Sequence, residues 1–347
     1  MSETLLAAAL ARRNTGRPPV WFMRQAGRYH RHYQALRAKH EFIALCKQPE
    51  LATEVTMGPI DDFGFDAAIL FSDLLFPLEA MGMGLSYEPG PKLGWHLRST
   101  ADLQRLAGGL AAAAHMEFQA EAIRLLRPRL GAERALIGFV GGPFTLYAYA
   151  VAGSHEGFTR AGLLGLEDGL YTGFCERLVE LLAGNMVLQA KAGADCVALF
   201  DTAAGSLDPA QFARHAVTPL AQVIRLFRAS CPRTPLIYYS RDTGPAHWRA
   251  LDTLNIQCLG VDWRHDLAAT LSAQTPRWCL QGNLDPDWLL LPAAQLELRV
   301  RAVFAQVAAL PAATRAAWVS GLGHGVLQHT PEANVRLVLK IQREMFA

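Results

Sequence analysis

Short apolar runs recur eight times along the chain, and each is followed by Gly, Asp, Ser or Arg and then by helix-like sequence. The runs lie at residues 20–23, 67–71, 135–140, 196–200, 236–239, 258–261, 278–281 and 317–319. Strands that are apolar along their whole length are typical of parallel sheets whose faces are covered by helices. Eight such strands alternating with helices predict an α/β protein with a closed (β/α)8 barrel, the TIM barrel, rather than an open sheet.

Helical periodicity between the runs supports this alternation, most clearly at residues 174–191, 210–228, 294–310 and 331–345. The fifth, sixth and seventh runs start only about 20 residues apart, less than the roughly 30 residues of a usual strand–helix–strand unit, so short helices are expected there. A doubly wound sheet is the alternative, but no Gly-x-Gly-x-x-Gly opens a helix after a strand. No linker or repeat interrupts the pattern, and we predict a single domain over residues 1–347.

Composition argues against several classes of protein. With 51% hydrophobic and 18% charged residues, the chain has enough apolar material for a well-buried core. A net charge of +2 without a basic run argues against nucleic-acid binding, and no apolar run reaches the ~18 residues of a membrane span. The six scattered cysteines indicate buried thiols in a reducing compartment, and the first apolar stretch precedes its basic residues, the reverse of a secretory signal. We therefore predict a cytoplasmic protein.

Polar residues gather just after the predicted strands. In a barrel these positions converge on one mouth, where the catalytic residues of such enzymes lie. In chain order they are Arg24 and Arg28, Ser72 and Asp73, Pro143 with Tyr149, Asp201 and Thr202, Ser240 and Arg241, Asp262 and Trp263, Asn283 and Asp285, and His324.

Three of these sites carry distinct chemistry. Arg24 and Arg28 follow the first strand four residues apart, and guanidinium groups bind carboxylates through paired hydrogen bonds. Asp73 follows an apolar strand, where an isolated carboxylate is costly, so it is a site residue, a helix cap or half of an ion pair. His324 stands between two glycines, which allow a ligand to approach the imidazole closely. Tyr149 and Thr202 carry weaker signals.

Two long segments carry a specific resemblance. The segment Pro-Val-Trp-Phe-Met-Arg-Gln-Ala-Gly-Arg begins at Pro19, and Gly-Phe-Val-Gly-Gly-Pro-Phe-Thr-Leu-Tyr-Ala-Tyr-Ala-Val-Ala-Gly spans residues 138–153. They resemble the two signature regions of the uroporphyrinogen decarboxylase family. Shorter matches follow in the family's order: Phe-Ser-Asp at 71–73, Phe-Asp-Thr at 200–202, Gly-Val-Asp-Trp at 260–263, Gly-Asn-Leu-Asp-Pro at 282–286 and Gly-His-Gly at 323–325.

The resemblance implies a (β/α)8 barrel, usually a homodimer, that removes the four acetate carboxylates of uroporphyrinogen III to give coproporphyrinogen III in heme biosynthesis. No metal or organic cofactor is implied. Asp73 would contact the pyrrole N–H groups and stabilise positive charge, while Arg24 and Arg28 would bind substrate carboxylates. Tyr149, Thr202 and His324 would line the tetrapyrrole pocket. Phe139 would belong to its apolar wall. Arg28 and a water are both candidates for the proton donor, although arginine, which stays protonated at any working pH, is a poor acid.

Two departures from the family pattern leave alternatives open. Gly321 stands where an Asn is expected, and Arg241-Asp242-Thr243-Gly244 replaces a Lys-Gly-Gly-Gly-like stretch. A divergent relative that acts on or binds another tetrapyrrole would show such changes. A corrinoid-dependent methyltransferase of the same superfamily would need a His-x-Cys zinc pair, and none of the eleven histidines has Cys two residues later. A non-catalytic tetrapyrrole carrier would have no need of Asp73.

Overall fold

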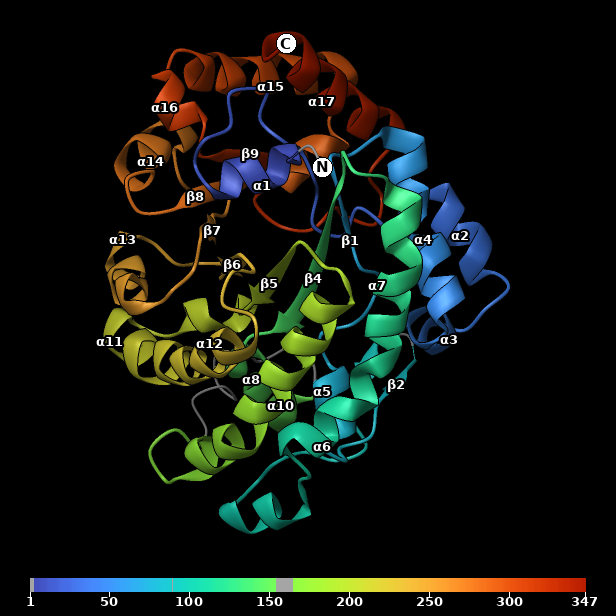
Figure 1. The fold of residues 1–347 in the computed structure, drawn as a ribbon, viewed down its shortest axis with the longest axis vertical. Helices are drawn as coiled ribbons and strands as arrows, with labels where there is room; N and C mark the ends of the chain where they lie inside the picture. The colour runs from blue at the N-terminus through green and yellow to red at the C-terminus, as the bar shows by residue number, and fades with distance from the viewer. Residues whose placement is uncertain (1–2, 89, 154–164) are drawn as a thin grey trace.

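A parallel sheet that curls into a barrel organises the chain (Figure 1). The computed structural model describes residues 3–88, 90–153 and 165–347. Within them, seven parallel strands pair in the order in which they occur along the chain, without the reversal that a doubly wound sheet contains. They are β1 (Ala67–Ile69), β4 (Ala135–Gly141), β5 (Cys196–Phe200), β6 (Leu236–Tyr239), β7 (Cys258–Gly260), β8 (Cys279–Leu284) and β9 (Trp318–Leu322).

The first predicted strand, residues 20–23, is reduced to a single bridge between Val20 and Ser320 of β9, which corrects the prediction of eight full strands. Val20 nevertheless joins the two edges of the sheet, because its carbonyl also accepts the Asp66 N–H at 3.0 Å, just before β1. The Trp21 N–H still donates to the Ser320 carbonyl at 3.3 Å. Beyond Trp21, side chains replace the ladder: the Phe22 N–H donates to Gln25 Oε1 at 3.2 Å, and Gln25 Nε2 donates to the Ala67 carbonyl at 3.1 Å. The barrel is therefore closed, and the α/β barrel prediction is confirmed.

Helices surround the strands in Figure 1, with α14 to α17 along one arc and α2, α4 and α7 along another. The predicted long helices are present, with ends that differ by a few residues, and residues 212–217 form a π-helical turn before α12. The helices are α1 (Leu5–Leu10), α2 (Arg31–Arg37), α3 (Phe42–Lys47), α4 (Pro49–Phe63), α5 (Phe76–Ala80), α6 (Gly109–Ala113), α7 (Glu117–Leu130), α8 (Pro143–Ala152), α10 (Leu170–Ala192), α11 (Pro209–Gln211), α12 (Thr218–Ser230), α13 (Pro245–Trp248), α14 (Leu267–Gln274), α15 (Ala293–Ala308), α16 (Ala312–Arg315) and α17 (Glu332–Met345).

The close spacing of β6, β7 and β8 is met by short helices, as predicted. Helix α13 has four residues and is extended by a 3-10 turn at Arg249–Thr253, and α14 has eight. A small hairpin of β2 (Ser86–Tyr87) and β3 (Pro91–Lys92) lies in the connection between β1 and β4.

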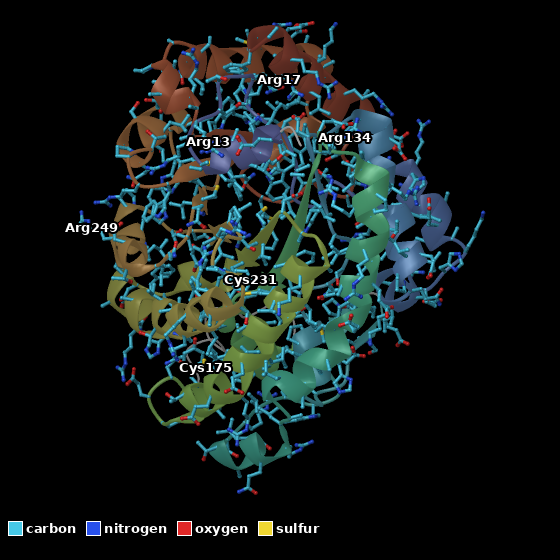
Figure 2. The ribbon with its side chains drawn as sticks, in the orientation of Figure 1. Arg13, Arg17, Arg134, Cys175, Cys231 and Arg249 are labelled. Atoms are coloured by element: carbon cyan, nitrogen blue, oxygen red, sulfur yellow. The ribbon has the colours of Figure 1, made fainter. Side chains whose placement is uncertain are left out.

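One continuous apolar cluster runs from α1 through the strands to α17, and it includes fully buried Trp21 and Trp318. Arg17 and Arg134 lie at the end of the barrel where the strands begin (Figure 2). The opposite end, where the strands finish, carries the predicted site residues.

Candidate active site

A tight turn after the Val20 bridge places Arg24 at the mouth. The Gln25 N–H donates to the Phe22 carbonyl at 3.0 Å, and Arg24 has a left-handed backbone with φ 62°. That conformation is unusual for a residue with a Cβ and marks a position fixed by its surroundings. The Val326 N–H also bonds the Met23 carbonyl at 2.9 Å, which ties this turn to the loop after β9.

The loop after β9 makes room for the Arg24 side chain. A Cβ added at Gly325 would lie 2.4 Å from Arg24 Cδ and 2.9 Å from Nε. A larger residue at this position would have to displace the arginine. The glycines that flank His324 therefore include one that packs directly against Arg24.

Asp73 lies in the same electrostatic environment as Arg24. Its Oδ1 accepts the Leu75 N–H at 2.9 Å, so it also closes a local turn. Burial raises the pKa of Asp73, while the Leu75 amide, the Tyr87 hydroxyl and the Arg24 guanidinium oppose the rise. The buried Tyr87 hydroxyl lies close enough to act on the carboxylate but forms no hydrogen bond of normal geometry with any described residue.

Tyr149 completes this group. Its side chain is 5% exposed, and burial and then Asp73 raise its pKa while Arg24 lowers it. Arg24 itself is exposed to solvent, yet burial by the surrounding protein lowers its pKa. A side chain in a deep opening has both properties, because water reaches its atoms while protein surrounds it. Arg24, Asp73 and Tyr149 thus come together from three separate segments.

Arg28 adds a second positive charge beside the first. It is exposed, and it lowers the pKa of Arg24 through like-charge repulsion. Two neighbouring guanidinium groups of like charge favour an anion between them, and a carboxylate fits the planar donor geometry of arginine. The spacing of the two arginines in the sequence therefore corresponds to proximity in space.

His324 is held by Tyr239 at the end of β6 and lies near Trp263, which follows β7. Tyr239 donates its hydroxyl hydrogen to the Gly323 carbonyl at 2.8 Å, and His324 Nδ1 lies 3.1 Å from the same hydroxyl oxygen. The Tyr239 hydroxyl therefore lies within hydrogen-bond distance of both the Gly323 carbonyl and the imidazole and orients the His324 ring. The Tyr239 and His324 rings stack with centroids 6.0 Å apart, and Trp263 lies 6.4 Å from His324.

Phe139 and Thr202 lie on the neighbouring strand ends. Phe139 is 8% exposed on β4, and its ring centroid is 5.7 Å from that of Phe200 on β5. Thr202 is half-buried and begins a 3-10 turn, Thr202–Ser206, directly after β5. Neither is joined to Arg24 or Asp73 by a described contact, and strand order alone puts them on the adjoining wall.

A second cationic group at the mouth was not fully predicted. Arg241 Nε contacts Asp242 Oδ2 at 2.9 Å, and Arg264 pairs with both Asp242 and Asp262. Arg241, Arg264 and Arg24 each lower the pKa of Tyr239, against a larger rise caused by burial, so three guanidinium groups act on one phenol. Arg264 follows the Asp262-Trp263 pair that the sequence placed at a strand end, and extending that segment by one residue would have identified it.

The departure at Gly321 has a steric cause. A Cβ at this position would lie 2.5 Å from Gln281 Nε2 and 2.7 Å from the Trp21 carbonyl oxygen. The Gln281 amide occupies the space that an Asn side chain would need. Gln281 comes from β8, so the change at Gly321 is matched by a residue on the neighbouring strand.

No set of three or more His, Cys, Asp or Glu side chains suited to hold a metal ion occurs in residues 3–88, 90–153 and 165–347. None of the helices in the described part of the chain combines the length and apolar character needed to cross a bilayer. What the mouth does offer is guanidinium groups for carboxylates, one carboxylate for N–H donors or a cation, and a wall of aromatic rings.

Comparisons with known proteins identify the family and the fold. The family model described as uroporphyrinogen decarboxylase (URO-D) matches residues 1–345. A uroporphyrinogen decarboxylase from Roseiflexus sp. (strain RS-1) is 36% identical over 354 residues, covering 100% of both chains. Another from Pelobacter propionicus is 36% identical over 338 residues, covering 94% of each. Among solved structures, a methyltransferase from Methanosarcina mazei has a TM-score of 0.79 over 100% of both chains at 18% identity, which shows a shared fold.

Proposed function

Because this chain belongs to the uroporphyrinogen decarboxylase family, we propose that it removes the carboxylates of the four acetate side chains of uroporphyrinogen III and releases coproporphyrinogen III, a step of heme biosynthesis. The observation that carries the proposal is the group of Asp73, Arg24 and Tyr149, in which the charge of the guanidinium acts on the carboxylate and on the phenol in partly desolvated surroundings. The exposed Arg28 extends the cationic side of this group.

The substrate itself can serve as the electron sink for this reaction, so no organic cofactor is required. A proton adds to the pyrrole ring beside the acetate, and the ring nitrogen becomes an iminium-like cation. The bond to the carboxylate then breaks, CO2 leaves, and the electron pair neutralises the cation as an exocyclic methylene forms. A second proton converts the methylene to a methyl group, and loss of the ring proton restores the pyrrole. One proton is consumed for each CO2 released.

Each residue then has a physical task. Asp73 accepts pyrrole N–H groups and stabilises the ring cation, since a fixed carboxylate in a water-poor site lowers the energy of a developing positive charge. Arg24 and Arg28 bind the remaining carboxylates and orient the reacting acetate. Tyr149, Thr202 and His324 line the pocket, and Phe139 belongs to its apolar wall.

Replacing Asp73 tests the assignment. In an anaerobic assay with uroporphyrinogen III, with the products oxidised and separated by carboxylate number, we expect Asp73→Asn to lower kcat by roughly 100-fold, the usual effect of removing one preorganised electrostatic group. Asp61→Asn is the matched control, because Asp61 is exposed on α4. Near-native turnover by Asp73→Asn would refute the role of Asp73.

A relative that acts on another tetrapyrrole is the second candidate. It is favoured by Gly321 and by the Arg241–Asp242–Arg264 ion pairs, which change the shape and charge of one side of the mouth. The wild-type protein separates the two: loss of carboxylates from uroporphyrinogen III supports the decarboxylase, and binding of the substrate without any loss of CO2 supports the relative.

We also propose that the protein works in the cytoplasm as a homodimer. Sedimentation equilibrium of the purified chain at micromolar concentration tests the assembly, for which a species of twice the 37.9 kDa chain mass is expected. A single monomeric species across the concentration range would contradict it. Cell fractionation with an antibody to the chain tests the location.

A further inference from the structure

Helix α8, which carries Tyr149, is capped by a residue from another strand. The helix starts after Gly142, and glycine has no side-chain oxygen to accept the first N–H groups. Asp201, at the end of β5, supplies one instead: its Oδ1 accepts the Thr145 N–H at 2.7 Å. Asp201 thus takes the place of the missing cap.

Two more hydrogen bonds join the same segments. The Thr145 hydroxyl oxygen accepts the Ala203 N–H at 3.0 Å, and the Gly142 N–H donates to the Phe200 carbonyl at 2.8 Å. A Cβ at Gly142 would lie 2.3 Å from both Cβ and Cγ of Asp201, so the glycine is what allows the carboxylate to approach. The first turn of α8 and the end of β5 are therefore fixed to each other from both sides.

Asp201 is costly in this position. It is 0% exposed, and its Oδ2 has no hydrogen-bond partner among the described residues. A Ser, Thr or Asn at position 142 would cap α8 from within its own segment, without a buried charge. What the distant carboxylate adds is a link between α8, which bears Tyr149, and the turn that begins with Thr202.

We propose that Asp201 is a positioning residue, whose carboxylate acts with the Thr145 side chain to fix α8 against the end of β5 and so to hold Tyr149 beside Asp73 and Arg24. The inference rests on the proposed function for its kinetic test. Asp201 does not touch the substrate, since it is fully buried, and it acts through Tyr149.

The contact between the Asp201 carboxylate and the start of α8 is expected to depend on pH. Asp201 is faced by Tyr238 of β6 and by Tyr171 and Cys175 of α10, the last of which is labelled in Figure 2. Burial raises the pKa of all three, so they stay uncharged at neutral pH. Burial also raises the pKa of Asp201 to about 6, against the hydrogen bonds from Thr145. Below pH 6 the carboxylate takes up a proton, which removes its attraction to the positive end of α8 but also removes the larger cost of burying its charge.

Kinetics provide the first test. We expect Asp201→Asn and Thr145→Val each to lower kcat by ~10- to 100-fold while KM changes less than twofold, because a shift of a site residue by about 1 Å costs rate rather than binding. Asp208→Asn is the control: Asp208 also caps a helix, α11, but on the exposed surface, and kcat should not change. Unchanged kcat in both test variants would overturn the proposal, and Thr145→Val keeps the test valid if Asp201→Asn fails to fold.

Hydrogen exchange provides a test that does not depend on the substrate. In the wild-type protein, the protection factors of amides at the start of α8 should rise as pH drops from 7 to 5, after correction for intrinsic exchange, because opening of α8 exposes Asp201 and returns its raised pKa toward the ordinary value. In Asp201→Asn they should be independent of pH. If the wild-type protein were inactive on uroporphyrinogen III, the proposed function would be wrong. The exchange pattern would still test whether Asp201 fixes α8 to the end of β5. Equal, pH-independent protection in both proteins would overturn it.

Discussion

The Asp66 side chain is one of the groups that hold residues 20–23 against β1 and close the barrel. Its carboxylate accepts the Val20 N–H at 2.8 Å and is bound by both terminal nitrogens of Arg17, at 2.6 and 2.5 Å. Asp66 is 9% exposed and Val20 is fully buried. Removing the carboxylate with Asp66→Ala would therefore leave a buried N–H and a guanidinium without their acceptor.

The expected loss of stability follows from these contacts. Breaking a buried ion pair by removing one partner costs about 3–5 kcal/mol, and hydrogen bonds to charged groups contribute about 1.5–3 kcal/mol each. The Arg17 side chain is 26% exposed, so water compensates part of its loss. We expect Asp66→Ala to lower the free energy of unfolding by about 3 kcal/mol. Asp66→Asn, which keeps an acceptor for Val20 but no charge for Arg17, should cost about half as much.

Urea unfolding measures this loss. With an m-value of about 3 kcal/mol/M, the midpoint of Asp66→Ala should fall by about 1 M at unchanged m. Arg301→Ala is the control, because Arg301 also pairs with two carboxylates, those of Glu297 and Glu344, but on the surface, where such pairs contribute less than about 1 kcal/mol. A midpoint shift for Asp66→Ala no larger than that of Arg301→Ala would refute the reasoning.

Three further outcomes are expected. Arg264→Ala should raise KM for the tetrapyrrole about tenfold in steady-state assays if this cation binds a substrate carboxylate, and an unchanged KM would exclude that contact. Gly321→Ala should destabilise the fold by about 1–3 kcal/mol in thermal unfolding, since the new methyl meets Gln281 and the Trp21 carbonyl; an unchanged Tm would mean that both give way. The pKa of Asp201 is about 6 in the native state and 3.8 as its ordinary value, so the native state binds this proton more tightly than the unfolded chain. The free energy of unfolding of the wild type therefore falls as pH rises through this window, by about 3 kcal/mol in all. The stability of Asp201→Asn relative to wild type should therefore increase between pH 5 and pH 8 by about half that amount, and a constant difference in urea midpoints would contradict the raised pKa.

Much of the barrel follows from local sequence. Runs such as 196–200 and 236–239 are apolar, bounded by polar residues and separated by helical periodicity, and they form β5 and β6 with the predicted limits. The reduction of the strand at residues 20–23 to a single bridge could not be predicted in this way. Two N–H groups of this strand, those of Val20 and Phe22, are bound by the side chains of Asp66 and Gln25, and a side chain 46 residues away leaves no local pattern.

The site was predictable where strand ends determine it. Arg24, Asp73 and Tyr149 come together because the barrel brings the ends of its strands to one mouth. The left-handed backbone of Arg24 was not predictable, since arginine ordinarily avoids positive φ. The role of Asp201 was also hidden, because a cap that reaches α8 from β5 depends on tertiary packing rather than on the residues before the helix.

The Val20 bridge has a consequence for the order of assembly during synthesis. Its partner Ser320 lies 300 residues later in the chain, and Pro18 accepts a hydrogen bond from Gln342 of α17 at 2.6 Å. The segment that carries Arg24 leaves the ribosome first, yet it cannot dock until the last strand and the last helix have emerged. Contacts between residues so far apart in the sequence form late. Closing such a long loop reduces the chain entropy, and this loss is compensated only once the intervening chain is folded. The guanidinium pair of Arg24 and Arg28 is therefore expected to dock at the final step of folding, so that an incomplete chain would lack this side of the mouth.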